Sequence, residues 1–228
     1  MPFQNLPARL AEVREQVEQA RERGGRGQAV TIVAVTKTYG ADAPIAAWNA
    51  GLQDVGENRV QEAVAKMAEV PLPVRWHLIG HLQRNKVRQL DAFHLVHSMD
   101  SARLADALAE QGRMRGRPMD VLLQVNVSGE GTKGGYEPHH VAAEAERLRA
   151  MRDGLTVRGV MTMAPFDAAE QVLRTVFTGA RQSAERLREA GHPATELSMG
   201  MSGDFVIAVE EGATLVRLGT VLFGARSG

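Results

Sequence analysis

The chain has 228 residues, in which 27 Lys and Arg balance 27 Asp and Glu, and it contains no cysteine. The absence of cysteine excludes disulfides, thiolate metal sites and a cysteine nucleophile. Zero net charge and only 4% aromatic residues argue against nucleic-acid binding, which draws on basic surfaces and stacking platforms. No apolar run approaches the ~20 residues that span a bilayer, and the amino terminus becomes charged at once, so we expect a cytoplasmic protein without membrane contact.

The amino-terminal segment predicts an amphipathic helix over Leu6–Arg21, followed by a glycine cluster that ends it. A β-branched run over Val30–Thr36 comes next, with apolar residues on both faces, as in a strand buried within a parallel sheet. Lys37 stands at the end of this strand. The apolar positions of the helix are Leu6, Leu10, Val13 and Val17.

Short apolar segments then alternate with longer amphipathic ones, of which 101–113, 138–152 and 168–190 are typical helices. Eight such alternations predict an α/β fold, a (β/α)8 TIM barrel covered by the first helix. An open doubly wound sheet is the alternative. No linker is visible, so we expect one domain over residues 1–228. The predicted strands are Thr31–Lys37, Asp54–Asn58, Trp76–Gly80, Leu95–Asp100, Val121–Val127, Val157–Met163, Glu196–Gly200 and Leu215–Gly219.

The active face of such a barrel is built from the carboxyl ends of its strands. Lys37 is the most informative residue there, because a partly desolvated amine is available to form a Schiff base with a carbonyl group. A lysine at a strand end can equally extend into solvent. The other residues at these ends are Asn58, His81, Asp100, Asn126, Met163, the turn at 200–203 and the segment 217–220.

Two glycine-containing loops follow the last two predicted strands, within Ser198–Asp204 and Val216–Thr220. Barrels often hold a phosphate at these loops with backbone N–H groups. Glycine lets the backbone approach an anion closely, and hydroxyl groups add donors. Two ordinary capped turns would show the same residue types. The candidate anion-binding residues are Gly200, Ser202, Gly203, Gly219 and Thr220.

An amine and an anion cradle on one face suit an aldehyde that carries a phosphate, and pyridoxal 5'-phosphate (PLP) is such a compound. Arg217 lies between the two and is a candidate partner for the pyridine nitrogen. Because an arginine keeps its proton, that nitrogen would stay unprotonated, which makes the ring a weaker electron sink. The alternative for Arg217 is a salt bridge to a surface carboxylate.

The histidines do not predict a metal site, and neither HExxH nor another metal motif is present. His77 and His81 would lie about 13 Å apart along an extended segment. We expect Met161 and Met163 on one side of the sixth strand, in core packing or, if inward, against a bound ring. The histidines expected at capping or surface positions are His94, His97, His139 and His140.

A set of motifs runs from the first predicted strand to the last and resembles the pyridoxal phosphate homeostasis proteins. These are fold-type III PLP-binding barrels, similar to the amino-terminal domain of alanine racemase. Tyr39-Gly40 departs from the basic residue and proline that the family often has there. The matching segments are 34–37, 56–58 with Gln61-Glu62, 76–83 with Asn85-Lys86, 124–126 with Lys133 and Gly134, 159–161, 197–202 with Asp204, and 216–220 with Phe223-Gly224.

The resemblance implies that Lys37 carries PLP covalently as a Schiff base and that Arg217 faces the pyridine nitrogen. It also implies a phosphate site and a lining for the cofactor. The phosphate site would be Ser202, Gly203, Gly219 and Thr220, and the lining Asn58, Met161 and Ser198.

The family resemblance implies intracellular PLP (vitamin B6) homeostasis without established catalysis. PLP-dependent apoenzymes are the candidate partners, and a monomer is expected. The sequence continues for only a few residues after the predicted eighth strand, so we expect no carboxyl-terminal domain of the kind that supplies a catalytic tyrosine in related racemases. A PLP-dependent amino-acid racemase or a Schiff-base aldolase of low activity is the alternative. Racemisation needs an acid/base group on each face of the substrate carbon, and the sequence has two tyrosines that could supply one, Tyr39 and Tyr136. A third possibility is that Leu6–Arg21 docks a partner protein instead of serving as a solvated cover.

Overall fold

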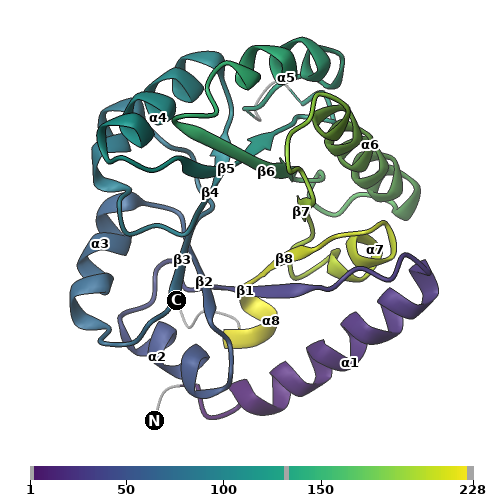
Figure 1. Ribbon diagram of the computed structural model, residues 1–228. Helices are drawn as coiled ribbons and strands as arrows, with labels where there is room; N and C mark the ends of the chain where they lie inside the picture. Colours follow the sequence, from purple (N-terminus) through teal and green to yellow (C-terminus); the bar gives the residue numbers. More distant parts are fainter. Residues whose placement is uncertain (1–2, 131–133, 225–228) are drawn as a thin grey trace.

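Eight parallel strands close into a barrel in the computed structural model, which describes residues 3–130 and 134–224 (Figure 1). Lys133, quoted in one of the motifs, lies outside the described residues. β1 pairs with β8, which confirms the closed (β/α)8 prediction and excludes an open sheet. The strands are β1 (Thr31–Val35), β2 (Asp54–Glu57), β3 (Arg75–Leu78), β4 (Leu95–Met99), β5 (Met119–Gln124), β6 (Leu155–Met161), β7 (Glu196–Ser198) and β8 (Leu215–Leu218).

Helices surround the barrel and alternate with its strands (Figure 1). The segment between β3 and β4 forms only a 3₁₀ helix, because this basic run offers a single buried residue, Val87, and no apolar stripe for a longer helix. The helix predicted over 138–152 is divided into η2 and α5. The helices are α1 (Leu6–Gly24), α2 (Asp42–Asn49), α3 (Val60–Glu69), η1 (Arg84–Gln89), α4 (Ala102–Met114), η2 (Pro138–His140), α5 (Val141–Arg149), α6 (Glu170–Glu189), α7 (Phe205–Glu210) and α8 (Thr220–Phe223).

The first helix covers the side of the barrel where β8 meets β1, against α7 and α8 (Figure 1). A side chain at Gly24 would place its Cβ 2.6 Å from the carbonyl oxygen of Glu210, so glycine permits the close approach of α1 to α7. The prediction of a covering helix is therefore confirmed. Its buried residues are Leu6, Leu10, Val13, Val17 and Ala20.

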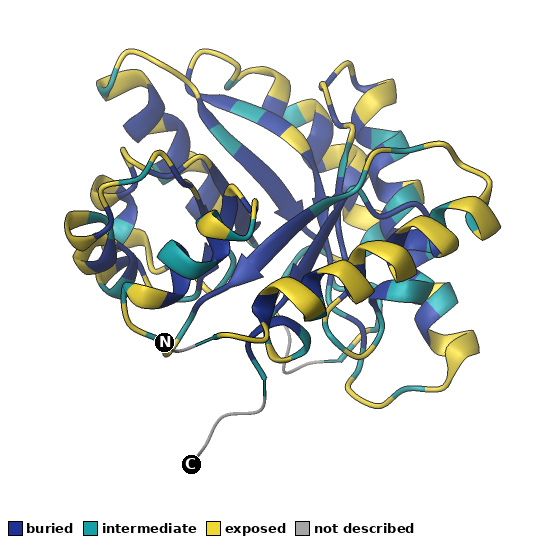
Figure 2. Cartoon of the chain, turned by 90° about the horizontal axis from the view of Figure 1, so that it is seen from below, coloured by how far each residue is buried: buried dark blue, intermediate teal, exposed yellow. Residues whose placement is uncertain are grey.

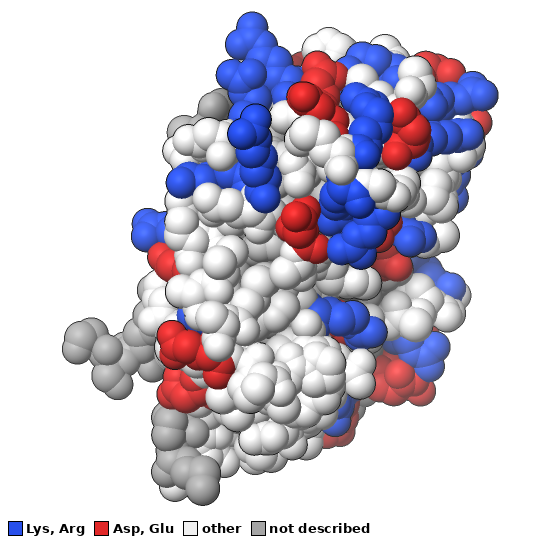
Figure 3. Space-filling view, turned by 60° about the vertical axis from the view of Figure 1, so that its left-hand side comes forward, with Lys and Arg blue, Asp and Glu red and all other residues white. Residues whose placement is uncertain are grey.

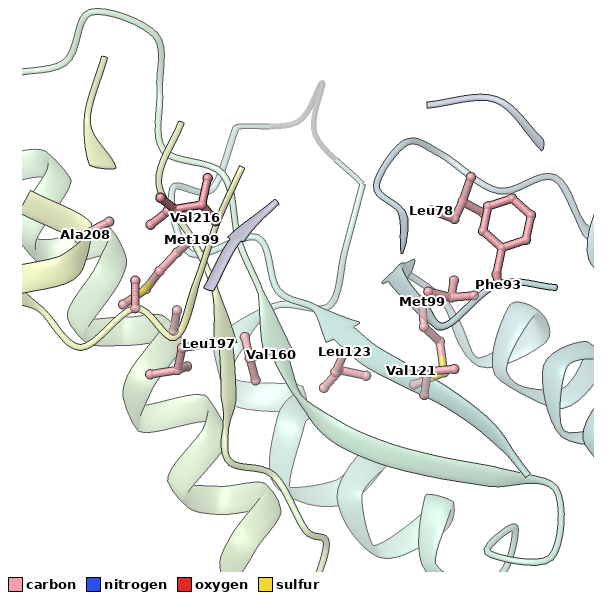
Figure 4. Packing of buried hydrophobic residues seen from close by; sticks show 14 of the residues in the cluster. Leu78, Phe93, Met99, Val121, Leu123, Val160, Leu197, Met199, Ala208 and Val216 are labelled. Carbon is pink, nitrogen blue, oxygen red and sulfur yellow. The ribbon is translucent and has the colours of Figure 1, made fainter. Parts of the chain in front are cut away.

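Buried side chains form two layers, one between the strands and the helices and one inside the barrel. Figure 4 shows the outer layer, in which Leu123, Val160 and Leu197 project from β5, β6 and β7. Figure 2 shows the buried strands enclosed by helices whose outer faces are exposed. The apolar residues of the inner layer are Val33, Leu95, Leu122, Met161 and Leu215, with Met163 packed against them. Met161 and Met163 thus both point inward.

The outer surface mixes charges of both signs. On the face shown in Figure 3, Lys and Arg gather in the upper part with Asp and Glu between them, so no extended field of one sign covers it. None of the helices in the described part of the chain is long and apolar enough to cross a bilayer.

Candidate functional site

A cavity of about 1160 Å³ opens at the carboxyl ends of the strands. Its walls come from all sides of the barrel, because each strand ends at this face and passes into a loop. The cavity brings the predicted amine, the predicted arginine and four of the five predicted anion-binding residues to one place, whereas Gly200 packs against Phe205 and Ala208 and does not line it. Of the predicted site residues, Lys37, Asn58, Ser202, Gly203, Arg217, Gly219 and Thr220 line it.

Lys37 lies just past the end of β1, half-buried in the wall of the cavity. The next residue, Thr38, has φ 70°, a left-handed conformation that is strained for a β-branched side chain. Such strain persists only where neighbouring contacts hold the backbone. The conformation turns the chain sharply at the point where the amine enters the cavity.

A buried ion pair supports the strand ends that carry Lys37 and Asn58. Lys66 Nζ donates to Glu57 Oε1 at 2.6 Å and to the carbonyl oxygen of Thr36 at 2.8 Å. The Thr36 hydroxyl donates to the same carboxylate oxygen at 2.5 Å. The sequence analysis assigned no role to Glu57 or Lys66. Lys66 recurs at helical spacing with Val60 and Ala63, which was a signal for a buried lysine with a partner.

The loop after β7 and the turn after β8 meet at Ser202. Its Oγ accepts hydrogen bonds from the backbone N–H groups of Gly219 at 3.3 Å and Val221 at 3.4 Å. The loop is closed by Asp204, whose Oδ1 accepts from the N–H of Met201 at 2.6 Å. A Cβ built on Gly203 would meet no atom within 4 Å, so open space adjoins the backbone there. The two loops present N–H and hydroxyl donors around one point of the cavity, as an anion requires.

Arg217 reaches the cavity from β8 with only 5% of its surface exposed. Its Nη1 donates to Ser198 Oγ at 2.6 Å and its Nη2 to the carbonyl oxygen of Thr162 at 3.0 Å. Burial lowers the pKa of Arg217 to about 10, while the nearby charge of Asp204 acts in the opposite direction. No carboxylate of the described residues forms an ion pair with it, so the surface salt-bridge alternative is wrong.

Met161 and Ser198, both predicted to line the site, lie beneath the cavity wall. Met161 is 1% exposed and packs inside the barrel, whereas Met163 is the methionine that lines the cavity. Ser198 is fully buried and touches Arg217 from below. Neither residue is therefore part of the cavity lining, although Ser198 contacts Arg217, which is.

The opposite wall carries further polar groups. His81 Nδ1 lies 3.0 Å from Asp100 Oδ2, and both residues line the cavity. Gly80 passes directly beside Asn58: a Cβ at this glycine would lie 2.4 Å from the Asn58 carbonyl oxygen. Glycine thus allows the loop after β3 to close against the end of β2.

The prediction that His97 is a capping or surface residue is wrong. His97 is fully buried, with its Nδ1 2.8 Å from Ser198 Oγ. His97 follows the inward Leu95 by two residues on β4, so it also points into the barrel, where its partners come from β3 and β7. His77 is also buried. Within the described ranges, the only cluster with metal-ligand geometry is the exposed trio Glu137, His139 and His140, which does not line the cavity.

The two tyrosines are both engaged with other groups. Tyr39 lines the cavity, but its ring packs against Phe3 and Phe223 at centroid distances of 5.3 Å, and its hydroxyl lies 3.5 Å from the Gly224 carbonyl oxygen. Tyr136 donates to Glu144 Oε1 at 2.7 Å. Burial, followed by the hydrogen bond to Glu144, raises the pKa of Tyr136 far above its usual value.

Comparison with known proteins shows the family of the chain. The alanine racemase N-terminal domain family matches residues 8–227. The pyridoxal phosphate homeostasis protein of Aquifex aeolicus is 40% identical over 97% of this chain and 99% of its own length. That of Pseudomonas aeruginosa is 42% identical over 95% of this chain and 94% of its own. The chain belongs to the pyridoxal phosphate homeostasis protein family.

Solved structures of related proteins have the same barrel fold. PipY of Synechococcus elongatus PCC7942 has been solved with PLP bound. It has a TM-score of 0.85 and 38% identity to this chain, and the match covers 96% of this chain and 100% of PipY. Alanine racemase of Streptomyces lavendulae has a TM-score of 0.74 at 19% identity, and the match covers 96% of this chain and 58% of the racemase. The racemase shares the barrel fold with this family member.

Proposed function

We propose that this protein binds PLP as a single domain, with a Schiff base on Lys37, and serves intracellular vitamin B6 homeostasis in the cytoplasm. The observation that carries the proposal is the meeting of Lys37, a buried arginine and two donor-rich loops in one cavity. The PLP-bound structure of PipY and the names of the homologues support it.

The residues present fit such a group. Arg217 is a buried cation facing the cavity without an ion-pair partner among the described residues, which suits a neutral ring nitrogen as acceptor. The backbone at Gly203 borders open space into which an anion could fit. The cavity volume of about 1160 Å³ lies just above the range of ordinary cofactor pockets, roughly 300–1,000 Å³, so a cofactor of this size has room.

Each group of residues has a separate task in this proposal. Lys37 supplies the amine, and Asn58 lines the wall beside it. Arg217 donates a hydrogen bond to the ring nitrogen, supported from beneath by Ser198, with Met161 filling the floor. When bound, PLP supplies an electrophilic carbonyl and an electron-withdrawing ring. The phosphate is held by Ser202, Gly203, Gly219 and Thr220.

We further propose that the protein stores or delivers PLP rather than turning over amino acids. Racemisation requires a second acid/base group opposite the lysine, and the groups on that wall, His81 and Asp100, are paired with each other at 3.0 Å. The hydroxyl of Tyr39 is directed to the backbone of Gly224, and Tyr136 is held by Glu144 and does not line the cavity. A monomer that hands PLP to dependent apoenzymes would need no such group.

The test combines absorption spectroscopy with borohydride reduction and peptide mapping. The chain has four lysines, so mapping discriminates Lys37 from Lys66, Lys86 and Lys133. We expect reduced cofactor on Lys37, its loss in Lys37→Arg, and its retention in Lys86→Arg. A colourless protein that PLP does not modify, or a label on another lysine, would contradict the proposal. Production of D-alanine from L-alanine would contradict the non-catalytic part.

A further inference from the structure

A continuous chain of buried polar groups crosses the interior of the barrel. His77 Nε2 lies 2.9 Å from Asp54 Oδ1, and His77 Nδ1 lies 2.8 Å from His97 Nε2. His97 Nδ1 lies 2.8 Å from Ser198 Oγ, which accepts from Arg217 Nη1 at 2.6 Å. The chain runs from β2 and β3 through β4 to β7 and β8, on the other side of the barrel (Figure 1).

The middle of this chain of groups lies in an apolar interior, and its two ends are almost fully buried. Exposure is 5% for Asp54 and Arg217, 1% for His77, and zero for His97 and Ser198. A buried polar atom that lacks a partner is costly, so each hydrogen in the chain must lie between a donor and an acceptor. The surrounding apolar residues are Val33, Leu95, Leu122, Met161 and Leu215.

The two ends of the chain determine where the hydrogens lie. Arg217 can only donate, so Ser198 accepts from it and donates its own hydrogen to His97 Nδ1. The proton of His97 is then on Nε2, which donates to His77 Nδ1. The proton of His77 is likewise on Nε2, and it donates to the Asp54 carboxylate, which can only accept. Both rings are neutral in this arrangement.

The surroundings of His97 and Asp54 favour a neutral His97 and an ionised Asp54. Burial, followed by the charges of His77, Arg217 and His94, lowers the pKa of His97 well below its usual value. Burial would raise the pKa of Asp54, but hydrogen bonds from His77 and Arg75 outweigh it and lower that pKa to about 2.

The chain joins two cavities at opposite ends of the barrel. Arg217 lines the large cavity at the carboxyl ends of the strands. Asp54 lines a cavity of about 440 Å³ at their amino ends, together with Arg14 and Arg75. Arg75 binds the Asp54 carboxylate at 2.6 and 2.8 Å. The far end of the chain is therefore held in place by a cation at the base of the barrel.

We propose that Asp54, His77, His97 and Ser198 form a one-directional hydrogen-bond relay that orients Arg217, with His77 and His97 as positioning residues. The relay itself is inferred from the geometry of the barrel interior. The statement that Arg217 is oriented toward the pyridine nitrogen of PLP rests on the proposed function. Cooperative hydrogen bonds that all point the same way strengthen one another, so the relay holds the guanidinium rigidly toward the cavity.

Histidine tautomers test the relay without cofactor. Long-range ¹H–¹⁵N spectra of the ¹⁵N-histidine-labelled, cofactor-free protein at pH 8, assigned through the backbone, report which ring nitrogen carries the proton. We expect His77 and His97 to be neutral with the proton on Nε2. A proton on Nδ1 of either ring, or a charged ring at this pH, would overturn the relay. The measurement needs no variant and does not depend on PLP binding.

Variants of His97 test its role toward Arg217. Leucine fills the space without hydrogen bonds, whereas glutamine offers an acceptor for Ser198 and a donor for His77. We expect His97→Leu to weaken PLP binding by roughly tenfold and to shift the absorption band of the bound cofactor, and His97→Gln to restore both. His94→Gln is the control, because His94 contacts His77 edge-on but lies outside the relay.

The outcomes separate the two proposals. A folded His97→Leu protein with wild-type PLP affinity and spectrum would refute the positioning role. If the wild-type protein fails to bind PLP, the proposed function fails, while the tautomer measurement still decides the relay.

Discussion

Replacing Lys66 with methionine should strongly destabilise the protein, because it leaves a buried carboxylate without its cation. Glu57 is fully buried, and Lys66 is 8% exposed. Oε1 of Glu57 would keep only the Thr36 hydroxyl, and Oε2 has no hydrogen-bond partner among the residues that the structure describes. Removing one member of a buried pair costs about 3–5 kcal/mol. For a chain of this length, that corresponds to a fall in melting temperature of roughly 6–20 °C.

Urea unfolding of the cofactor-free protein, followed by circular dichroism, measures this loss. The double variant Glu57→Gln/Lys66→Met should recover most of the stability, because its buried groups are neutral. Lys86→Met is the matched control, since Lys86 lies in η1 and forms no ion pair with the described residues. A Lys66→Met protein as stable as Lys86→Met would refute the reasoning. We also expect Lys66→Met to loosen PLP, because Lys66 holds the carbonyl group of Thr36 that precedes Lys37.

Three further predictions concern acid stability, packing and turnover. The histidine and arginine partners of Asp54 outweigh the effect of burial and lower its pKa from 3.8 to about 2, so the ionised carboxylate stabilises the fold above pH 4. Between pH 4 and pH 2, the unfolding free energy of the wild type should fall by about 2 kcal/mol more than that of Asp54→Asn. Equal losses in acid unfolding would contradict this. Gly80→Ala should lower the urea midpoint and PLP retention, because the added Cβ would lie 2.4 Å from the Asn58 carbonyl oxygen. Gly203→Ala is the control: its added Cβ would meet no atom within 4 Å, so the urea midpoint should stay unchanged. Tyr39→Phe should change the unfolding free energy by no more than ~0.5 kcal/mol and should leave the rate of D-alanine formation unchanged. A racemase activity that this substitution abolishes would show that Tyr39 is a catalytic base.

The sequence by itself determined the alternation of strands and helices and the end of each strand to within a few residues. Apolar runs and amphipathic stripes are local properties, so they can be read without the fold. The position of Lys37 after β1 and of Arg217 within β8 follows from the same patterns. Because parallel strands all present their carboxyl ends to one face, the predicted amine and the glycine-rich loops could be assigned to one site.

Only the tertiary structure decided what lies beneath that site. Alternation puts His97 on the same side of β4 as Leu95, but only the closed barrel shows that this side is the interior. The partners of this histidine come from strands 20 and 101 residues away in the sequence, and Lys66 meets a carboxylate from another element. Such contacts depend on how the barrel closes and on which buried polar groups it brings together. In the sequence alone, a buried polar residue cannot be told from a surface residue, because its partner comes from a distant segment.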